Sequence, residues 1–111
     1  RVLYIKPAEK TSFMILDAGM TELIRPALYR SLHFIQNLSS QEGSEVYDVV
    51  GPVCETSDAF ARGLSLPKAK RGDLLAIRSA GAYGEAMASQ YNLRDAAPCI
   101  FAITGFFPFT I

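Results

Sequence analysis

The sequence predicts a mainly β fold, a small β-barrel or sandwich, with short helices near residues 21–31 and 84–91. Two observations predict it: apolar and β-branched residues come in short runs, and turn-forming residues separate these runs at short intervals. The 111 residues are enough for one domain with a single core, and no repeat or low-complexity linker divides them. We therefore expect residues 1–111 to form one compact unit.

The chain begins with a predicted hairpin and a broken helix. The apolar runs RVLYIKP and SFMILDAG are separated by the polar AEKT, which predicts two antiparallel strands. MTELIRPALYRSL predicts a helix that Thr21 caps and that Pro26 keeps short. The apolar residues of this segment recur near helical spacing, at Leu23, Ile24, Leu28 and Leu32.

The remaining elements are predicted to be mostly strands. HFIQNL and VYDVVGPV are strand-like and flank the loop SSQEGSE. The next segment, ETSDAFARGLSLPKAKRGD, is predicted to be irregular, and DLLAIRSAGA to be a strand entered from a turn. YGEAMASQYN predicts a helical turn or two, and the apolar PCIFAITGFFPFTI predicts a final strand.

The charge balance excludes several classes of partner. Eleven basic and eleven acidic residues give a formal net charge of zero with no basic stripe, so we expect neither nucleic acid nor a membrane surface as a partner. The apolar runs are too short to span a bilayer, and the start does not resemble a signal peptide. Because the first residue is Arg1 and not Met, we expect the chain to begin inside a longer product or to have been trimmed.

The two cysteines, Cys54 and Cys99, do not have the spacing of a metal site or of a disulfide framework. The single histidine, His33, does not complete a zinc site with them. We therefore expect reduced thiols and a cytoplasmic location, with Cys99 as a thiol of the core.

The stretch VVGPVCETSD places a thiol and a carboxylate next to each other, directly after a strand-like run. A cysteine at the end of a buried strand most often acts as a small hydrophobic residue. Neighbouring residues of an extended chain point to opposite sides, so Cys54 and Glu55 face one site only where the strand bends. Gly51 and Pro52 supply a reason for such a bend. A thiol is mostly protonated at neutral pH, so Cys54 suits either an acid or a nucleophile.

Two further groups are candidates for binding. Arg25 and Tyr29 lie four residues apart in RPALY, so a helix brings both to one face, where they suit a carboxylate; a solvated arginine beside a half-buried tyrosine is the alternative. SAGAYGEAMAS surrounds Tyr83 with small residues, and Gly81 and Gly84 permit a turn that presents the phenol outward, although such segments are also ordinary turns.

Taken together, these segments resemble the C-terminal β-domain of diaminopimelate decarboxylases. The similar segments are FMILDAGMTELIRPALY, YDVVGPVCETSD and GDLLAIRSAGAYGEAMASQYNLR, which together cover most of residues 1–94. The family belongs to the fold-type III enzymes that use pyridoxal 5'-phosphate, alongside the ornithine and arginine decarboxylases. In these enzymes an α/β barrel holds the cofactor and a β-domain closes the site, in homodimers whose sites are shared between subunits.

The resemblance implies a role for each candidate residue. Arg25 and Tyr29 would bind the distal carboxylate of the substrate, and Glu55 its distal ammonium group. Cys54 would be the proton donor after carbon dioxide leaves, and Tyr83 would contact the cofactor. Cys54 and Glu55 would serve the barrel of the partner subunit.

The resemblance also implies a substrate, meso-2,6-diaminopimelate, which the enzyme converts to L-lysine and carbon dioxide. Its distal carbon carries both an ammonium and a carboxylate, whereas ornithine has only the amine. Ornithine-type relatives usually have Cys-Asp where this chain has Cys54-Glu55, and they lack RPALY. An arginine without its carboxylate partner penalises the wrong substrate.

The chain departs from the family in two respects. The Schiff-base lysine belongs to the missing barrel, and none of the four lysines here matches it, so we expect this chain alone to be inactive: Lys6, Lys10, Lys68 and Lys70. Residues 95–111 end on the apolar GFFPFTI, where relatives have a charged tail. Two alternatives remain, a decarboxylase of a related amino acid and a non-catalytic module that pairs with a full-length decarboxylase.

Overall fold

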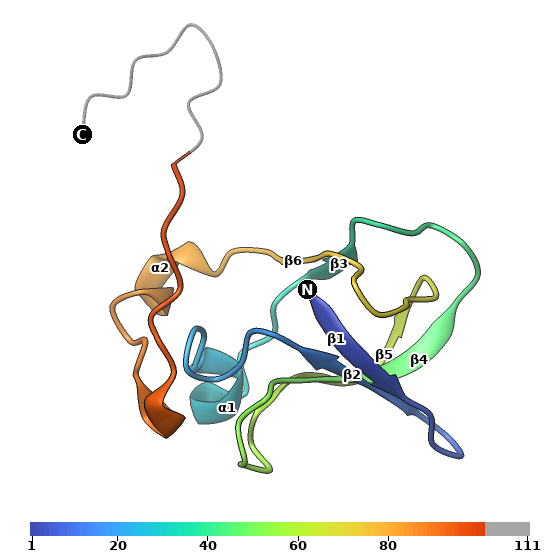
Figure 1. Ribbon diagram of the computed structural model, residues 1–111, viewed down its shortest axis with the longest axis horizontal. Coiled ribbons are helices and arrows are strands. Elements are labelled where there is room, and N and C mark those ends of the chain that lie inside the picture. Colours follow the sequence, from blue (N-terminus) through green and yellow to red (C-terminus); the bar gives the residue numbers. More distant parts are fainter. Residues whose placement is uncertain (102–111) are drawn as a thin grey trace, which may run out of the picture.

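The computed structural model describes residues 1–101, and its largest element is a four-stranded sheet (Figure 1). The strands lie in the order β1-β2-β4-β5 and span Val2–Lys6, Ser12–Leu16, Glu45–Val50 and Ala59–Leu66. β1 and β2 form the predicted antiparallel hairpin, β4 and β5 form a second antiparallel pair, and β2 runs parallel to β4. Parallel neighbours need a crossover, and residues 17–44 supply it.

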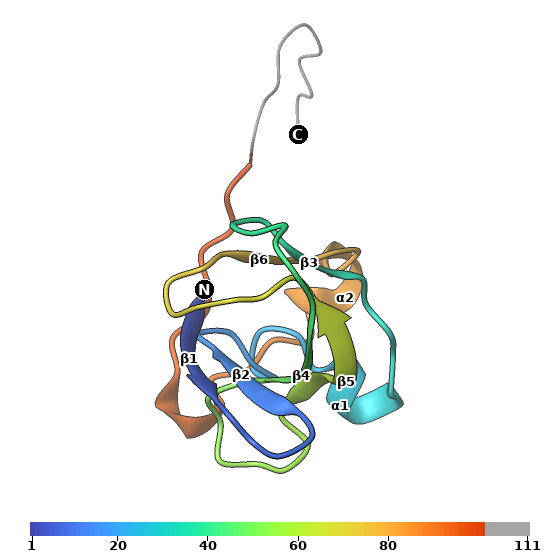
Figure 2. The ribbon, with the colours of Figure 1, turned by 90° about the vertical axis from the view of Figure 1, so that its right-hand side faces the viewer.

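A second, two-stranded sheet covers the core from the other side (Figure 2). It pairs β3, Ile35–Asn37, with β6, Leu75–Ile77, in antiparallel register. The core between the sheets is a single cluster of buried apolar side chains: Val2, Met14, Leu16, Leu23, Ile35, Tyr47, Val49, Phe60 and Leu66. The mainly β prediction is confirmed, although the sheets do not close into a barrel.

Tyr47 is the largest fully buried side chain, and its hydroxyl is hydrogen-bonded within the core. The hydroxyl donates to Glu45 Oε2 at 3.2 Å and accepts the Ala69 N–H at 3.0 Å. Burial raises the pKa of this phenol, and the nearby Glu45 carboxylate adds to the increase. The sheet therefore contains a buried phenol whose hydrogen-bond partners among residues 1–101 lie inside the fold.

The first helix is present and is shorter than the predicted segment, residues 21–31. α1 spans only Arg25–Tyr29, with Pro26 in its first turn and Arg30 in the left-handed conformation at its end. The predicted cap at Thr21 is wrong, because Ile24 occupies the cap position without a side-chain bond and Thr21 instead accepts a hydrogen bond from Arg94. The predicted apolar face is also wrong, because only Leu23 is buried and both Leu28 and Leu32 are exposed.

The second half of the chain differs from the prediction at residues 59–66 and, in part, near residues 84–91. Residues 59–66 form the long strand β5. The alternation of buried and exposed residues in this segment is too weak to predict a strand, because Arg62 and Gly63 both face solvent. The helix predicted near 84–91 is present as short turns: α2 spans Gly81–Gly84, the Met87 N–H donates to the Tyr83 carbonyl at 3.0 Å, and a 3-10 turn, η1, spans Tyr91–Leu93. Left-handed residues, Tyr83 in α2 and Asn92 in η1, keep each element short.

The predicted last strand is absent from residues 98–101, and the rest of it, including GFFPFTI, lies outside the described residues. Cys99 is exposed, so the prediction of a core thiol is wrong. Among residues 1–101, no helix is long and apolar enough to cross a membrane.

Candidate functional site

Cys54 and Glu55 lie on an exposed loop between β4 and β5. Val53 and Asp58 are buried at either end of the loop, and residues 54–57 between them are exposed. The Glu55 N–H donates to the Val53 carbonyl at 2.8 Å, which closes a three-residue turn around Cys54. The predicted bend after Val50 is therefore present, but the thiol is presented by the loop and not by the end of a buried strand.

Glu55 has a partner that the sequence did not single out. The Tyr91 hydroxyl, from η1, donates to Glu55 Oε1 at 2.5 Å. This hydrogen bond raises the pKa of Tyr91, and the charge of Glu55 and, to a smaller degree, Cys54 act in the same direction. Cys54, Glu55 and Tyr91 therefore form one group. No local spacing links Tyr91 to a residue so distant along the chain.

Arg25 and Tyr29 lie together as predicted, and Tyr83 joins them. The Arg25 guanidinium carbon lies 5.7 Å from the centre of the Tyr29 ring and 5.9 Å from the centre of the Tyr83 ring. These distances are those of cation–π contacts. Both rings are largely exposed, with 66% of Tyr83 accessible. The guanidinium therefore lies between two phenols on an open surface.

The backbone around Tyr83 is strained. Tyr83 has φ 64° and Ser79 has φ 56°, values that residues with a side chain rarely adopt. Such strain persists only where the surroundings hold it, and it gathers at binding sites. An outward-facing phenol was predicted here. Gly81 was predicted to let the backbone approach a ligand closely. Among the described residues, a Cβ at this position would meet nothing within 4 Å, so the space beside it is open.

The two groups lie at the same end of the four-stranded sheet (Figure 1). A hollow of about 560 Å³ includes Glu55 and Tyr91 in its lining, together with Ile24, which directly precedes Arg25. A second hollow, of about 480 Å³, includes Arg25 and Tyr83 in its lining. The hollow that contains Glu55 therefore borders the residue before α1, and the hollow that contains Arg25 borders α1 itself.

His33 is another residue of the second hollow. Its Nδ1 donates to the Arg78 carbonyl at 3.1 Å, which leaves Nε2 as the free ring nitrogen. Nε2 is buried and has no hydrogen-bond partner among residues 1–101. From the sequence, His33 was weighed only as a metal ligand. In the described part of the chain, no three histidine, cysteine or acidic side chains lie close enough together to hold a metal ion.

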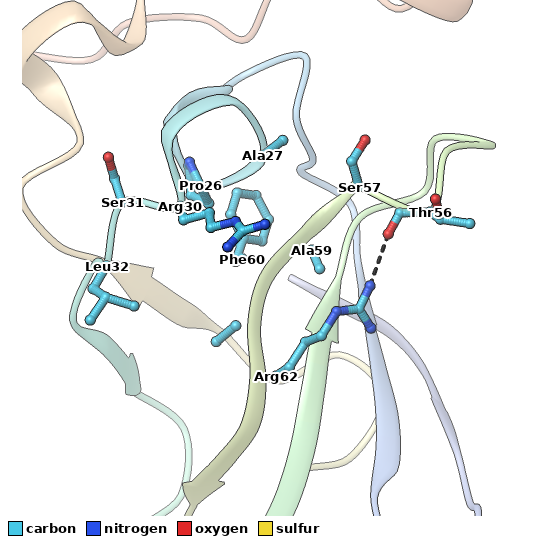
Figure 3. A pocket seen from close by; sticks show the side chains of 11 residues that line it. Pro26, Ala27, Arg30, Ser31, Leu32, Thr56, Ser57, Ala59, Phe60 and Arg62 are labelled. Carbon is cyan, nitrogen blue, oxygen red and sulfur yellow. Dashed lines mark hydrogen bonds between the residues drawn. The ribbon is translucent and has the colours of Figure 1, made fainter.

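A third hollow, of about 390 Å³, lies between α1 and the start of β5 and contains none of the five predicted residues (Figure 3). Phe60 lies beneath α1 there and belongs to the core. Arg62 donates from Nη2 to the Thr56 carbonyl at 2.8 Å and holds the outer part of the Cys54 loop. Arg62 therefore contributes to the shape of the loop that carries Cys54 and Glu55.

The positions of the lysines decide whether this chain alone could bind pyridoxal 5'-phosphate covalently. None of the four lysines borders the hollows that contain Glu55 or Arg25; Lys68 and Lys70 border a hollow with residues 39–42. Covalent attachment of an aldehyde cofactor needs a lysine amine. Among the described residues, the site therefore offers no point of covalent attachment for such a cofactor.

Comparison with known proteins identifies the fold. Residues 1–81 match the family model of the pyridoxal-dependent decarboxylase, C-terminal sheet domain. The chain is 61% identical over 95 residues to the diaminopimelate decarboxylase of Bacteroides thetaiotaomicron, covering 86% of this chain and 25% of that protein. It is 49% identical over 96 residues to the enzyme of Helicobacter pylori, covering 85% and 24%.

Solved structures agree with these matches. The diaminopimelate decarboxylase of M. jannaschii in co-complex with L-lysine superimposes with a TM-score of 0.82 at 42% identity, covering 86% of this chain and 22% of that one. The I148L mutant of the Helicobacter pylori enzyme, also complexed with L-lysine, gives 0.79 at 47% identity, covering 86% and 23%. The chain thus spans about a quarter of the length of these relatives. It belongs to the family of C-terminal sheet domains of pyridoxal-dependent decarboxylases.

Proposed function

We propose that this chain is the substrate-binding and dimer-forming domain of a diaminopimelate decarboxylase, which converts meso-2,6-diaminopimelate to L-lysine and carbon dioxide. One observation carries the proposal: Arg25 lies within cation–π distance of two phenols, and Ile24, which directly precedes it, lines the same hollow as Glu55. A guanidinium and a carboxylate at one site suit a substrate carbon that carries both a carboxylate and an ammonium group. The distal carbon of ornithine carries only an amine and therefore offers no partner for the guanidinium.

Each residue of the chain has a stated task in this proposal. Arg25 and Tyr29 bind the distal carboxylate, and Glu55 accepts hydrogen bonds from the distal ammonium group. Tyr91 donates to Glu55 and keeps that carboxylate oriented. The Cys54 thiol gives its proton from Sγ to the carbon that has lost carbon dioxide. Pyridoxal 5'-phosphate, when bound, serves as the electron sink for the bond that breaks, and Tyr83 contacts it.

The exposed surface of the site supports a second structural task. Leu28, Leu32 and Phe34 are exposed beside Tyr29, and 95% of Leu32 is accessible. Apolar groups that gather at one place on a surface mark an interface. The occupant that we propose is the pyridoxal-binding barrel, with Cys54 and Glu55 serving the barrel of the partner subunit in a homodimer. Both thiols are free, which agrees with a cytoplasmic enzyme.

The test is carbon dioxide release by the complete decarboxylase that carries this domain, given pyridoxal 5'-phosphate and then meso-diaminopimelate, ornithine or lysine. We expect turnover of meso-diaminopimelate alone. Arg25→Ala should lower kcat/KM by about tenfold to a hundredfold, since hydrogen bonds to charged groups contribute about 1.5–3 kcal/mol. Cys54→Ala should lower kcat by about a hundredfold or more.

Arg71→Ala is the matched control, because Arg71 is exposed and borders none of the hollows described above. It should leave both constants unchanged. Preference for ornithine would contradict the roles of Arg25 and Glu55. A folded dimer with bound cofactor that turns over none of the three substrates would favour the non-catalytic module.

A further inference from the structure

The buried carboxylate of Asp58 connects the two halves of the candidate site. Asp58 is only 4% exposed, and its two oxygens accept main-chain N–H groups from different loops. Oδ1 accepts the Met20 N–H at 2.7 Å, and Oδ2 accepts the Val53 N–H at 2.8 Å. A buried carboxylate is stable only when its oxygens are hydrogen-bonded, and bonds of this length to an ionised group are strong ones.

Two glycines make room for this carboxylate. A Cβ at Gly51 would lie 2.3 Å from Asp58 Oδ2, and a Cβ at Gly19 would lie 2.8 Å from the same oxygen. Both distances are too short for real contacts, so any other residue would displace the carboxylate. The sequence placed Gly51 in a bend, and the structure shows that this glycine is needed because the Asp58 side chain returns to the start of its own loop.

The two N–H groups belong to the segments that carry the site. Met20 lies in the loop that leads into α1 with its Arg25, and Val53 directly precedes Cys54. The Asp58 main chain closes the second loop as well, because its N–H donates to the Glu55 carbonyl at 3.1 Å. One residue therefore holds the segment that bears the guanidinium and the segment that bears the thiol and the carboxylate.

We propose that Asp58 is a positioning residue that fixes the separation between the Arg25 group and the Cys54–Glu55 turn. The proposal rests on the proposed function for its consequence, because a substrate carbon with both a carboxylate and an ammonium group needs both partners at a set distance. Asp58 is buried and lines neither the hollow that contains Glu55 nor the hollow that contains Arg25. It acts through the main chain of Met20 and Val53.

The first arm of the test uses the 111-residue chain and needs no substrate. Asp58→Asn replaces one oxygen by an NH₂ group that faces an N–H donor, so one of the two bonds is lost. We expect the amide proton that loses its acceptor, that of Met20 or that of Val53, to exchange at least tenfold faster in this variant, measured by NMR. Gly19→Ala displaces the carboxylate without removing it, and it should give the same pattern if Asp58→Asn does not fold.

Asp73→Asn is the matched control. Asp73 is also buried, at 6% exposed, and accepts a main-chain N–H from Lys70 at 3.0 Å, in a turn away from the site. It should lower stability without a selective effect on Met20 and Val53. Unchanged exchange at these two amides in Asp58→Asn and Gly19→Ala, or equal acceleration in Asp73→Asn, would overturn the proposal.

The second arm measures meso-diaminopimelate kinetics in the complete decarboxylase. Asp58→Asn should raise KM by about tenfold, whereas Asp73→Asn should leave KM unchanged, since a merely destabilising change lowers the amount of active enzyme and not its affinity. Equal KM values in Asp58→Asn and wild type would overturn the positioning role. If the wild-type enzyme does not act on meso-diaminopimelate, the proposed function fails, and the amide exchange still decides whether Asp58 holds the two segments.

Discussion

The four-stranded sheet and the loops at its end are built on opposite principles. The sheet buries the side chains of its inner face completely, as at Met14, Tyr47 and Val49, and satisfies its buried phenol internally. The loops instead leave Tyr83 and Cys54 exposed and hold a tyrosine in a strained conformation. The sheet is therefore stabilised by its own contacts, while the loops leave reactive and aromatic side chains accessible.

The largest expected effect is on the sheet. Met14→Ala removes a fully buried side chain and should lower the free energy of unfolding by about 2–5 kcal/mol, because it leaves a cavity. Urea unfolding followed by circular dichroism measures the change. Leu32→Ala, on the exposed surface beside α1, should change stability by less than about 0.5 kcal/mol. A similar loss in both variants would mean that Leu32 is packed in the isolated chain.

Tyr47→Phe should have the next largest effect, about 1–3 kcal/mol at neutral pH, because it leaves the Ala69 N–H without its acceptor. The folded pKa of Tyr47 is raised above its ordinary value of 10.0. Its contribution is therefore complete below pH 10 and is lost as pH rises through the folded pKa. The stability difference between pH 7 and pH 11 should be smaller in Tyr47→Phe than in wild type. Tyr4→Phe, at an exposed tyrosine, should leave that difference unchanged.

The smallest expected effect on stability is at the site itself. Glu55→Gln should leave the free energy of unfolding within about 0.5 kcal/mol of wild type, because the pair is exposed. It should lower the pKa of Tyr91 toward its ordinary value, since Glu55 is the main cause of the increase. Carbon-13 NMR of the tyrosine ring, assigned with Tyr91→Phe, measures this. Glu9→Gln is the control, and equal titration of Tyr91 in Glu55→Gln and wild type would contradict the contact.

The sequence predicted those parts of the fold that depend on neighbours along the chain. The first hairpin and the pairing of Arg25 with Tyr29 follow from period and spacing, and both are present. β5 was missed because its alternation is interrupted, and its extended form comes from pairing with β4. The second predicted helix is present only as short turns, with the left-handed Tyr83 and Asn92 on either side of residues 84–91.

The site was predicted residue by residue but not as an arrangement. Local pattern alone leaves Cys54 as a small buried side chain, and the resemblance to a family gives it a role; the structure places it on an exposed turn. Tyr91 and Asp58 were missed because their partners are main-chain or side-chain atoms in other loops. Such contacts depend on how the chain returns to itself, which no short window of sequence contains.

The parallel pairing of β2 with β4 has a consequence for the order in which the domain folds. Met14 meets Val49 only after the whole crossover, residues 17–44, has been closed into a loop. Closing so long a loop costs entropy before the contact returns any energy, and pairings between distant strands form slowly. The crossover contains Arg25 and Tyr29. Folding should therefore assemble the sheet as its slow step, and the basic half of the site should become ordered only when that step is complete.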